Sequence, residues 1–179
     1  VPYLTSKIDG SLTWQKSFTL PLNDAYKVLS LLQASDGANG SDHSRFRWSR
    51  TLNARQIQNS LLRTYPDISL PKELKVISRG ESGRVLALQI DVGTTKTPLV
   101  LRLDAIRRSL RELPSTLFVI RPAGNGVWNF LGGGFGHGAG LSQAGAIDLA
   151  RKGWTTKMIL KHYYPSTVYG SLPDLSNSL

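Results

Sequence analysis

The residues best suited to chemistry lie in the glycine-rich stretch Gly132–Ala146. Seven of its fifteen residues are glycine, and glycine loses more backbone freedom on ordering than any other residue, so such a run indicates bends or close approaches. His137 is its one titratable side chain and is flanked by glycine, which leaves little neighbouring bulk to hide the ring. Ser142 and Gln143 follow where a helical pattern starts. Imidazole, hydroxyl, carboxamide and helix-terminal N–H groups would suit a polar, partly anionic ligand.

Two other interpretations of this stretch stay open. A phosphate-binding loop is disfavoured because the chain has neither G-x-x-x-x-G-K-[ST] nor a well-placed G-x-G-x-x-G followed by an acidic residue in a βαβ unit. A purely structural turn would let Ala144, Gly145 and Ala146 pack closely on a sheet, with His137 bonded to a backbone group. The residues alone do not separate this structural turn from a ligand-facing one.

The glycine stretch reads G-x-G-H-G-x-G-L-S-Q-x-G-A over Gly134–Ala146, and I-L-x-H-Y-Y-P follows over Ile159–Pro165. Upstream, Arg79–Val85 reads R-x-x-S-G-R-V. Two further stretches read R-x-x-L at Arg107–Leu110 and S-T-x-F at Ser115–Phe118. Together these patterns resemble the signature of the stage II sporulation protein D family (SpoIID), which includes the LytB amidase enhancers. The resemblance extends over about residues 76–172, with a looser connection than the family's between its last two upstream stretches.

This resemblance implies an extracytoplasmic protein, in the cell wall or periplasm, that acts on peptidoglycan during sporulation-like wall remodelling. Family members are lytic transglycosylases that cut glycan strands, preferably strands stripped of stem peptides. Such scission needs a proton donor, for which a carboxyl group with a raised pKa is suited. The family's glutamate lies upstream beside an A-x-A-A-R-[ST]-Y-A-like segment that this chain lacks, and Glu73, Glu81 and Glu112 do not match its context. The catalytic residues therefore stay unknown, and we expect this chain alone to bind glycan without cleaving it.

The resemblance also suggests which residues contact the glycan. His137 and Gln143 would hydrogen-bond N-acetyl or hydroxyl groups, and Ser142 would cap its helix or donate to the ligand. An arginine would neutralise a lactyl carboxylate that becomes available once stem peptides are removed. The alternative for the arginines is to hold loops in place. The full set of expected substrate-binding residues is His137, Ser142, Gln143, Gly136, Gly138, Arg79, Arg84 and Arg107.

No metal or cofactor is expected. The chain has no cysteine, so it lacks the ligands of the His/Cys zinc site described for some relatives. The sequence also begins at Val1 without an initiator methionine, so we expect one domain over residues 1–179 that forms the C-terminal part of a longer protein.

Two rival functions stay open. The resemblance to the LytB branch implies a non-catalytic partner of a cell-wall amidase or another wall hydrolase. A net charge of +10 and a pI near 10.2 would also suit a general polyanion-binding module. Specific nucleic-acid binding is not expected, because no helix-turn-helix, zinc finger or RNP aromatic pair is present. No apolar span reaches 18 residues, so no transmembrane segment is expected.

The sequence patterns predict an α+β fold that positions these residues. It has a mainly antiparallel mixed sheet with several short packing helices. Strand patterns and helical patterns are interleaved without a regular βαβ period. Extended or hairpin-like structure is expected over 1–19, and helices over 21–34, 53–65, 104–110, 141–152 and 155–164. The expected polar residues at helix starts are Asn23 or Asp24, Thr51 or Asn53, Asp104 and Thr155. Strands are expected over 45–50, 74–79, 85–92, 99–103, 115–121 and 127–131. In the first strand, Phe46 and Trp48 are expected in the core with solvated arginines, or else at a sugar-stacking edge beside His43.

Overall fold

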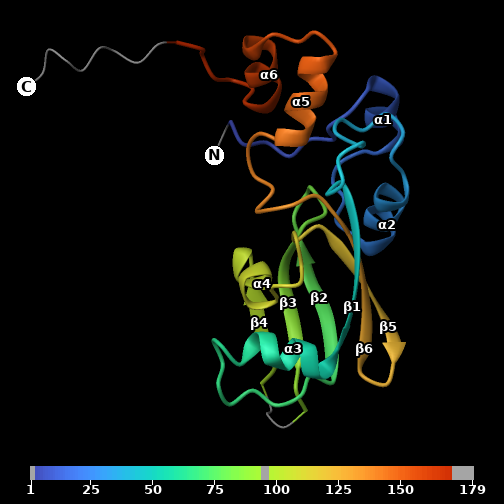
Figure 1. Cartoon of the computed structure of the whole chain (residues 1–179), viewed down its shortest axis with the longest axis vertical. Helices are drawn as coiled ribbons and strands as arrows, with labels where there is room; N and C mark the ends of the chain where they lie inside the picture. The colour runs from blue at the N-terminus through green and yellow to red at the C-terminus, as the bar shows by residue number, and fades with distance from the viewer. Residues whose placement is uncertain (1–2, 94–96, 171–179) are drawn as a thin grey trace, which may run out of the picture.

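Two three-stranded antiparallel sheets form the body of the molecule, which a computed structural model describes over residues 3–93 and 97–170 (Figure 1). The first sheet has the order β1-β6-β5 and the second the order β2-β3-β4. This arrangement confirms the predicted α+β class and its antiparallel pairing. The strands are β1 (Arg47–Asn53), β2 (Glu73–Arg79), β3 (Val85–Asp91), β4 (Leu99–Arg102), β5 (Phe118–Gly124) and β6 (Val127–Gly133).

Short helices cover the sheets and extend the molecule at one end. Thr155 caps its helix as predicted, and of the paired candidates Asp24 and Asn53 are the caps, each accepting a hydrogen bond from a first-turn backbone N–H. Asn53 also forms a reciprocal capping box with Gln56. The helices are α1 (Leu12–Ser17), α2 (Ala25–Gln33), α3 (Ala54–Leu61), α4 (Asp104–Ser109), α5 (Gln143–Arg151) and α6 (Thr156–Tyr163).

Two local predictions are wrong. The N-terminal stretch was expected to be extended, but it contains α1, because Ser11 caps the helix and Trp14 buries its ring against Phe18 at a centroid distance of 4.5 Å. Asp104 was expected to cap α4, but the cap position is Leu103, which makes no side-chain cap bond. The Asp104 carboxylate instead forms ion pairs with two arginines of the same helix.

One core joins both sheets to α3 and α4. Its largest fully buried side chain is Phe118 of β5, which packs edge-on against Phe130 of β6 at 5.6 Å and also contacts Trp48 of β1 at 6.4 Å. A second cluster lies under α1 and α2, with Phe46 packed against its edge. The predicted core position is confirmed for Trp48, whereas Phe46 is only partly buried.

The arginines of β1 depart from the prediction of solvated side chains at one position. The Arg47 guanidinium donates to the carbonyls of Leu31, Leu32 and Ala34 at 2.8–2.9 Å, so it satisfies the C-terminal end of α2. Burial lowers the pKa of Arg47 to about 10. Arg45 and Arg50, in contrast, are exposed.

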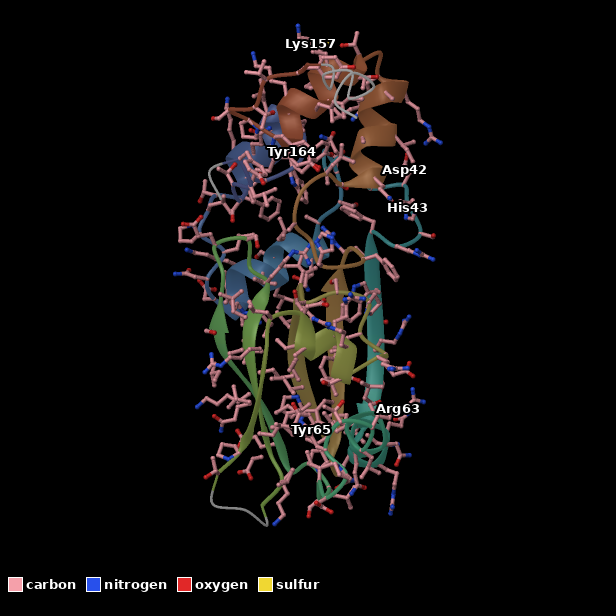
Figure 2. The ribbon with its side chains drawn as sticks, turned by 90° about the vertical axis from the view of Figure 1, so that its left-hand side faces the viewer. Asp42, His43, Arg63, Tyr65, Lys157 and Tyr164 are labelled. Carbon is pink, nitrogen blue, oxygen red and sulfur yellow. The ribbon has the colours of Figure 1, made fainter. Side chains whose placement is uncertain are left out.

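Helices α5 and α6 form a pair at one end of the molecule, beside α1 and the N-terminal segment (Figure 1). Figure 2 shows Tyr164 and His43 near this helical end, whereas Tyr65 and Arg63 lie at the opposite end, near α3. The pair has its own small apolar cluster, formed by Leu149, Ile159 and Tyr163. No helix among the described residues is long and apolar enough to cross a bilayer.

Candidate functional site

The glycine turn, residues 134–141, connects the end of β6 to the start of α5 and so joins the sheets to the helical pair (Figure 1). Its backbone φ is positive at Gly134, Gly136, Gly138 and Gly140. None of the three residues between them has a positive φ, so the sign alternates along the turn. This left-handed geometry at every second residue explains the spacing of the glycines, because side chains are disfavoured there.

His137 lies at the tip of the turn with its imidazole exposed to solvent. Its Nδ1 accepts a hydrogen bond from the Ala139 backbone N–H at 3.0 Å. The neutral ring therefore carries its proton on Nε2, and no partner for Nε2 lies within hydrogen-bond distance among residues 3–93 and 97–170. His137 is thus held by the backbone through Nδ1, while its Nε2–H donor faces solvent.

Ser142 and Gln143 stand where the turn becomes a helix. Ser142 is the N-cap of α5, and its Oγ accepts a hydrogen bond from the Gly145 backbone N–H at 3.2 Å. Gln143 is the first residue of the helix and is exposed. Ser142 thus has a structural use already, whereas the Gln143 carboxamide faces solvent.

The three predicted arginines have different surroundings. Arg79 donates from Nη1 to the carbonyls of Gly83 and Phe118 at 2.8 and 2.9 Å, and burial lowers its pKa to about 10, so it fastens the β2–β3 hairpin to β5. Arg107 pairs with Asp104 at 3.1 Å and is partly exposed. Arg84 lies directly under Gly138 of the glycine turn.

A cleft of about 360 Å³ opens beside the glycine turn, and we call it the arginine cleft. It is lined by Arg107, Arg108, Arg111, Leu113, Pro114 and Phe135. Phe135 belongs to the turn, is 58% exposed, and has the Arg45 guanidinium 4.3 Å from its ring centroid. Asp104 pairs with both Arg107 and Arg108, so one carboxylate is shared by two of the three lining arginines and the surface keeps a net positive charge.

Arg107 was expected at the site from the sequence, whereas the other cationic and aromatic residues of this surface were not. The spacing of Arg107, Arg108 and Arg111, at positions i, i+1 and i+4, would have been a signal for a cationic face of a helix. Phe135 stood inside the quoted motif, where an apolar residue between glycines has little neighbouring bulk to bury it. Arg45 had no signal, because its contact with Phe135 bridges residues 90 positions apart in the chain.

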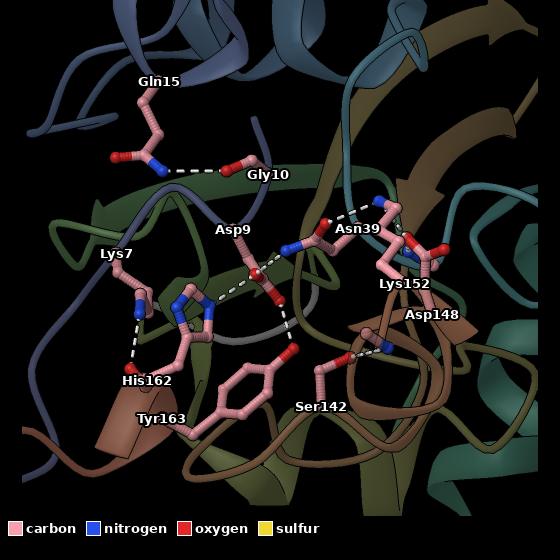
Figure 3. Close-up of polar contacts among 12 residues, drawn as sticks. Lys7, Asp9, Gly10, Gln15, Asn39, Ser142, Asp148, Lys152, His162 and Tyr163 are labelled. Carbon is pink, nitrogen blue, oxygen red and sulfur yellow. Dashed lines mark hydrogen bonds and ion pairs between the residues drawn. The ribbon is translucent and has the colours of Figure 1, made fainter. Parts of the chain in front are cut away.

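A second polar cluster holds the helical pair on the N-terminal segment (Figure 3). The Asp9 carboxylate accepts hydrogen bonds from Asn39 Nδ2 at 2.8 Å and from the Tyr163 hydroxyl at 2.7 Å, and it pairs with His162 Nε2 at 2.9 Å. Burial first, and then the Asp9 carboxylate, raise the pKa of Tyr163. His162 and Tyr163 of the sequence motif therefore have a structural role in this contact.

The tyrosines of the motif also explain two of its glycines. A Cβ atom at Gly145 would lie 2.1 Å from the Tyr163 hydroxyl, and one at Gly140 would lie 3.0 Å from the Tyr164 hydroxyl. The Tyr164 hydroxyl also accepts a hydrogen bond from the Leu141 N–H at 3.1 Å. The helical pair thus fixes the downstream end of the glycine turn.

No group of three or more His, Asp or Glu side chains that could hold a metal ion occurs within the described ranges 3–93 and 97–170. The candidate site therefore consists of cationic, aromatic and imidazole groups with exposed backbone N–H groups. Such a set can bind anions and stack on flat apolar faces, and it contains no carboxylate among the residues that line the cleft.

Comparison with known proteins places this architecture in a family. Residues 1–140 match a family described as a domain of unknown function (DUF8618), so the match covers both sheets and ends within the glycine turn. An uncharacterized protein of Brachyspira hyodysenteriae is 28% identical over 117 residues, which are 65% of this chain and 30% of that protein. The matched region thus spans less than a third of that relative. Because the family match covers well over half of the chain, the protein belongs to the DUF8618 family.

Proposed function

We propose that this protein binds the glycan strands of peptidoglycan in the cell wall or periplasm, as a SpoIID-like module that recognises strands stripped of stem peptides. The observation that carries the proposal is the exposed Phe135 ring at the junction between the glycine turn and the arginine cleft. The exposed imidazole of His137, two residues further along the turn, adds a hydrogen-bond donor. The motif resemblance to SpoIID supplies the substrate class.

The chemistry of a denuded glycan suits these groups. Each muramyl residue without its peptide carries a free carboxylate, which guanidinium groups such as Arg107 and Arg111 bind in a charge-assisted, bidentate manner. The apolar face of a sugar ring packs on an aromatic ring such as that of Phe135. N-acetyl and hydroxyl groups accept hydrogen bonds from the imidazole N–H of His137. The glycine turn and the arginine cleft beside it thus offer charge, stacking and hydrogen bonding.

Cleavage is a separate question from binding. A lytic transglycosylase needs a carboxyl group that protonates the glycosidic oxygen, and no residue that lines the arginine cleft is an acid. In our proposal this chain contributes the binding surface, and strand scission requires a glutamate from outside the chain. A non-catalytic role as the partner of a wall amidase is the alternative that the same observation favours.

General polyanion binding is the second candidate, and one observation favours it. A neighbouring cleft of about 290 Å³ shares Arg111 with the arginine cleft and adds Arg63, so cationic side chains continue from α4 toward α3. With a net charge of +10, such a surface would attract DNA or any acidic polymer. Binding of this kind weakens steeply with salt and has little preference for the chemistry of the polymer.

The experiment compares binding of denuded glycan strands, intact peptidoglycan and duplex DNA at low and physiological salt. We expect a preference for denuded glycan that persists at physiological salt and weakens about tenfold, or about 1.4 kcal/mol, in His137→Ala and in Arg111→Met. Arg121→Met is the matched control, because it removes one exposed charge from β5 without touching the cleft. Equal affinity for DNA and glycan, with the same loss in all three variants, would exclude the proposal and leave general polyanion binding.

A further inference from the structure

The side chain of Arg84 lies under the glycine turn in an unusual environment. A Cβ atom at Gly138 would lie 1.9 Å from its Cζ and 2.1 Å from its Nε, so the backbone of the turn rests directly on the guanidinium plane. A Cβ atom at Gly134, earlier in the turn, would lie 3.8 Å from Arg84 Nη2. The guanidinium therefore fills the inner side of the turn between these two glycines.

This guanidinium has no partner among the residues that the structure describes. Its Nη1 is shielded from solvent and makes no hydrogen bond, and no ion pair links Arg84 to a carboxylate within residues 3–93 and 97–170. Burial lowers the pKa of Arg84, and no charged neighbour opposes this effect. A buried cation without a counter-charge is strongly disfavoured, because the protein does not replace the lost hydration.

The contrast with two other buried arginines shows that this lack of partners is not general in the molecule. Arg47 donates to the carbonyls at the end of α2, and Arg79 donates to the carbonyls of Gly83 and Phe118. In both cases, hydrogen bonds to backbone carbonyls compensate for the hydration that the guanidinium loses on burial. Arg84 lacks such acceptors, although a buried guanidinium needs them equally.

The turn above Arg84 supplies further donors. The backbone N–H groups of His137, Gly138 and Gly140 make no hydrogen bond within the described part of the chain, and residues 137–140 are exposed. Alternation of the φ sign along the turn is the geometry in which successive N–H groups surround an anion. The turn is fixed by Gly136 N–H to Pro114 O and by Leu141 N–H to the Tyr164 hydroxyl.

We propose that Arg84 and the glycine turn form a receptor for one carboxylate group of the ligand, which binds to the guanidinium and to the unbonded N–H groups of His137, Gly138 and Gly140. The planar guanidinium and the planar carboxylate match in a bidentate pair. The inference rests on the proposed function in one respect: the ligand that carries the carboxylate is a glycan. The receptor shares the glycine turn with the arginine cleft, which Phe135 lines, so it adds one directional contact to a surface that otherwise attracts anions by charge.

The test uses small anions and the whole chain. Sodium acetate, sodium lactate and inorganic phosphate are compared with sodium chloride at equal ionic strength, in wild type, Arg84→Met and the control Arg121→Met. We expect acetate and lactate to raise the melting temperature of wild type and of the control saturably, by about 3–5 °C at ten times the dissociation constant, with no shift in Arg84→Met. Without anion, Arg84→Met should melt at or above the temperature of wild type, because it removes an unpaired buried charge.

Nuclear magnetic resonance of the wild type gives a second measurement, which decides if Arg84→Met does not fold. Acetate should shift the Arg84 Nε–Hε signal and the amide signals of residues 137–140. Absence of these shifts, or a response to phosphate alone, would overturn the assignment of a carboxylate receptor. The two proposals fail separately. If wild type and Arg84→Met bind glycan equally and acetate has no effect, only the carboxylate receptor is rejected. If acetate binds but glycan does not, only the proposal of glycan binding is rejected.

Discussion

The sheet body and the helical end of this molecule are held together by different forces. In the body, the core between the two sheets is apolar and includes Phe118, Phe130 and Trp128, all almost completely buried. At the helical end the apolar cluster consists of Leu149, Ile159 and Tyr163, and much of the contact with the N-terminal segment passes through the Asp9 carboxylate. Apolar burial stabilises without regard to direction, whereas a polar network depends on each partner. We therefore expect the helical end to open more readily than the sheets.

This difference bears on the candidate site, because the glycine turn joins the two regions. Its upstream end is fixed to the body, where the Gly134 carbonyl accepts a hydrogen bond from Trp48 Nε1 at 3.1 Å. Its downstream end is fixed to the helical pair through the Tyr164 hydroxyl. The glycine turn therefore has one anchor in each of the two regions.

The largest effect is expected from Phe118→Ala, which removes a ring that is 0% exposed and contacts Trp48 and Phe130. The loss of buried surface and the cavity left behind should lower the free energy of unfolding by about 3–5 kcal/mol, measured by urea denaturation. Leu12→Ala, on the exposed side of α1, is the control and should change it by less than about 0.5 kcal/mol. A loss below about 1 kcal/mol in Phe118→Ala would mean that the sheet core is not the main source of stability.

The next effect is expected from Asp9→Ala. This change leaves the Tyr163 hydroxyl, Asn39 Nδ2 and His162 Nε2 without their shared acceptor. An unsatisfied buried polar group costs about 1–3 kcal/mol, and we expect this loss to fall on the helical end. Hydrogen exchange should become faster in α5 and α6 while β3 and β6 keep their protection. Uniform loss of protection in both regions would contradict the division of the molecule into two differently stabilised parts.

Gly145→Ala is expected to change the free energy of unfolding by a comparable amount, but in the direction opposite to that usual for this replacement. In a helix interior this replacement normally stabilises by about 1 kcal/mol. Here the new Cβ would lie 2.1 Å from the Tyr163 hydroxyl and 2.8 Å from Asp9 Oδ2, so we expect destabilisation by about 1–3 kcal/mol. Thermal unfolding measures the change, and Ile147→Ala on the same helix, half exposed, is the comparison. An increase in stability would show that Tyr163 is not held where the structure places it.

The smallest expected effect is on the pH dependence of stability. A hydrogen bond from Lys152, together with one from the Gly40 N–H, lowers the pKa of Asp148 in the folded protein. A lowered folded pKa adds stability above the unfolded value of about 3.9, and this stability is lost as pH falls through the folded value. We therefore expect protection of α5 to decrease below about pH 4, and Lys152→Met to reduce that decrease by a few tenths of a kcal/mol. An identical pH profile in the variant would exclude this contact as a source of the acid sensitivity.

The sequence was sufficient for features that depend on near neighbours in the chain. The strand patterns over 85–92 and 127–131 predicted β3 and β6, and polar residues near the starts of α2, α3 and α6 predicted where these helices begin. Helix α1 was missed because six residues are too few for a clear period, and its stability comes from the burial of Trp14. Local patterns therefore gave the elements but not their partners.

The sites depend on contacts that no local pattern reports. Asp9 and His162 meet across 153 positions, and Arg45 reaches the ring of Phe135 through the fold. Arg84 and Arg79 were given the same expected role, yet Arg79 is bonded to two carbonyls and Arg84 has no partner among the described residues. The environments of two arginines five residues apart are set by the tertiary structure, which the sequence motif did not distinguish.

The most direct test of the central claim is a titration of the isotope-labelled protein with two glycans that differ in charge. One is denuded peptidoglycan strand, which carries carboxylates, and the other is an uncharged chitooligosaccharide of similar length. The account predicts that the denuded strand shifts the signals of residues 134–140, the Arg84 Nε–Hε group and the arginine cleft, whereas chitooligosaccharide shifts Phe135 and His137 only weakly. Equal shifts with both glycans, or shifts confined to exposed basic residues away from the turn, would contradict it.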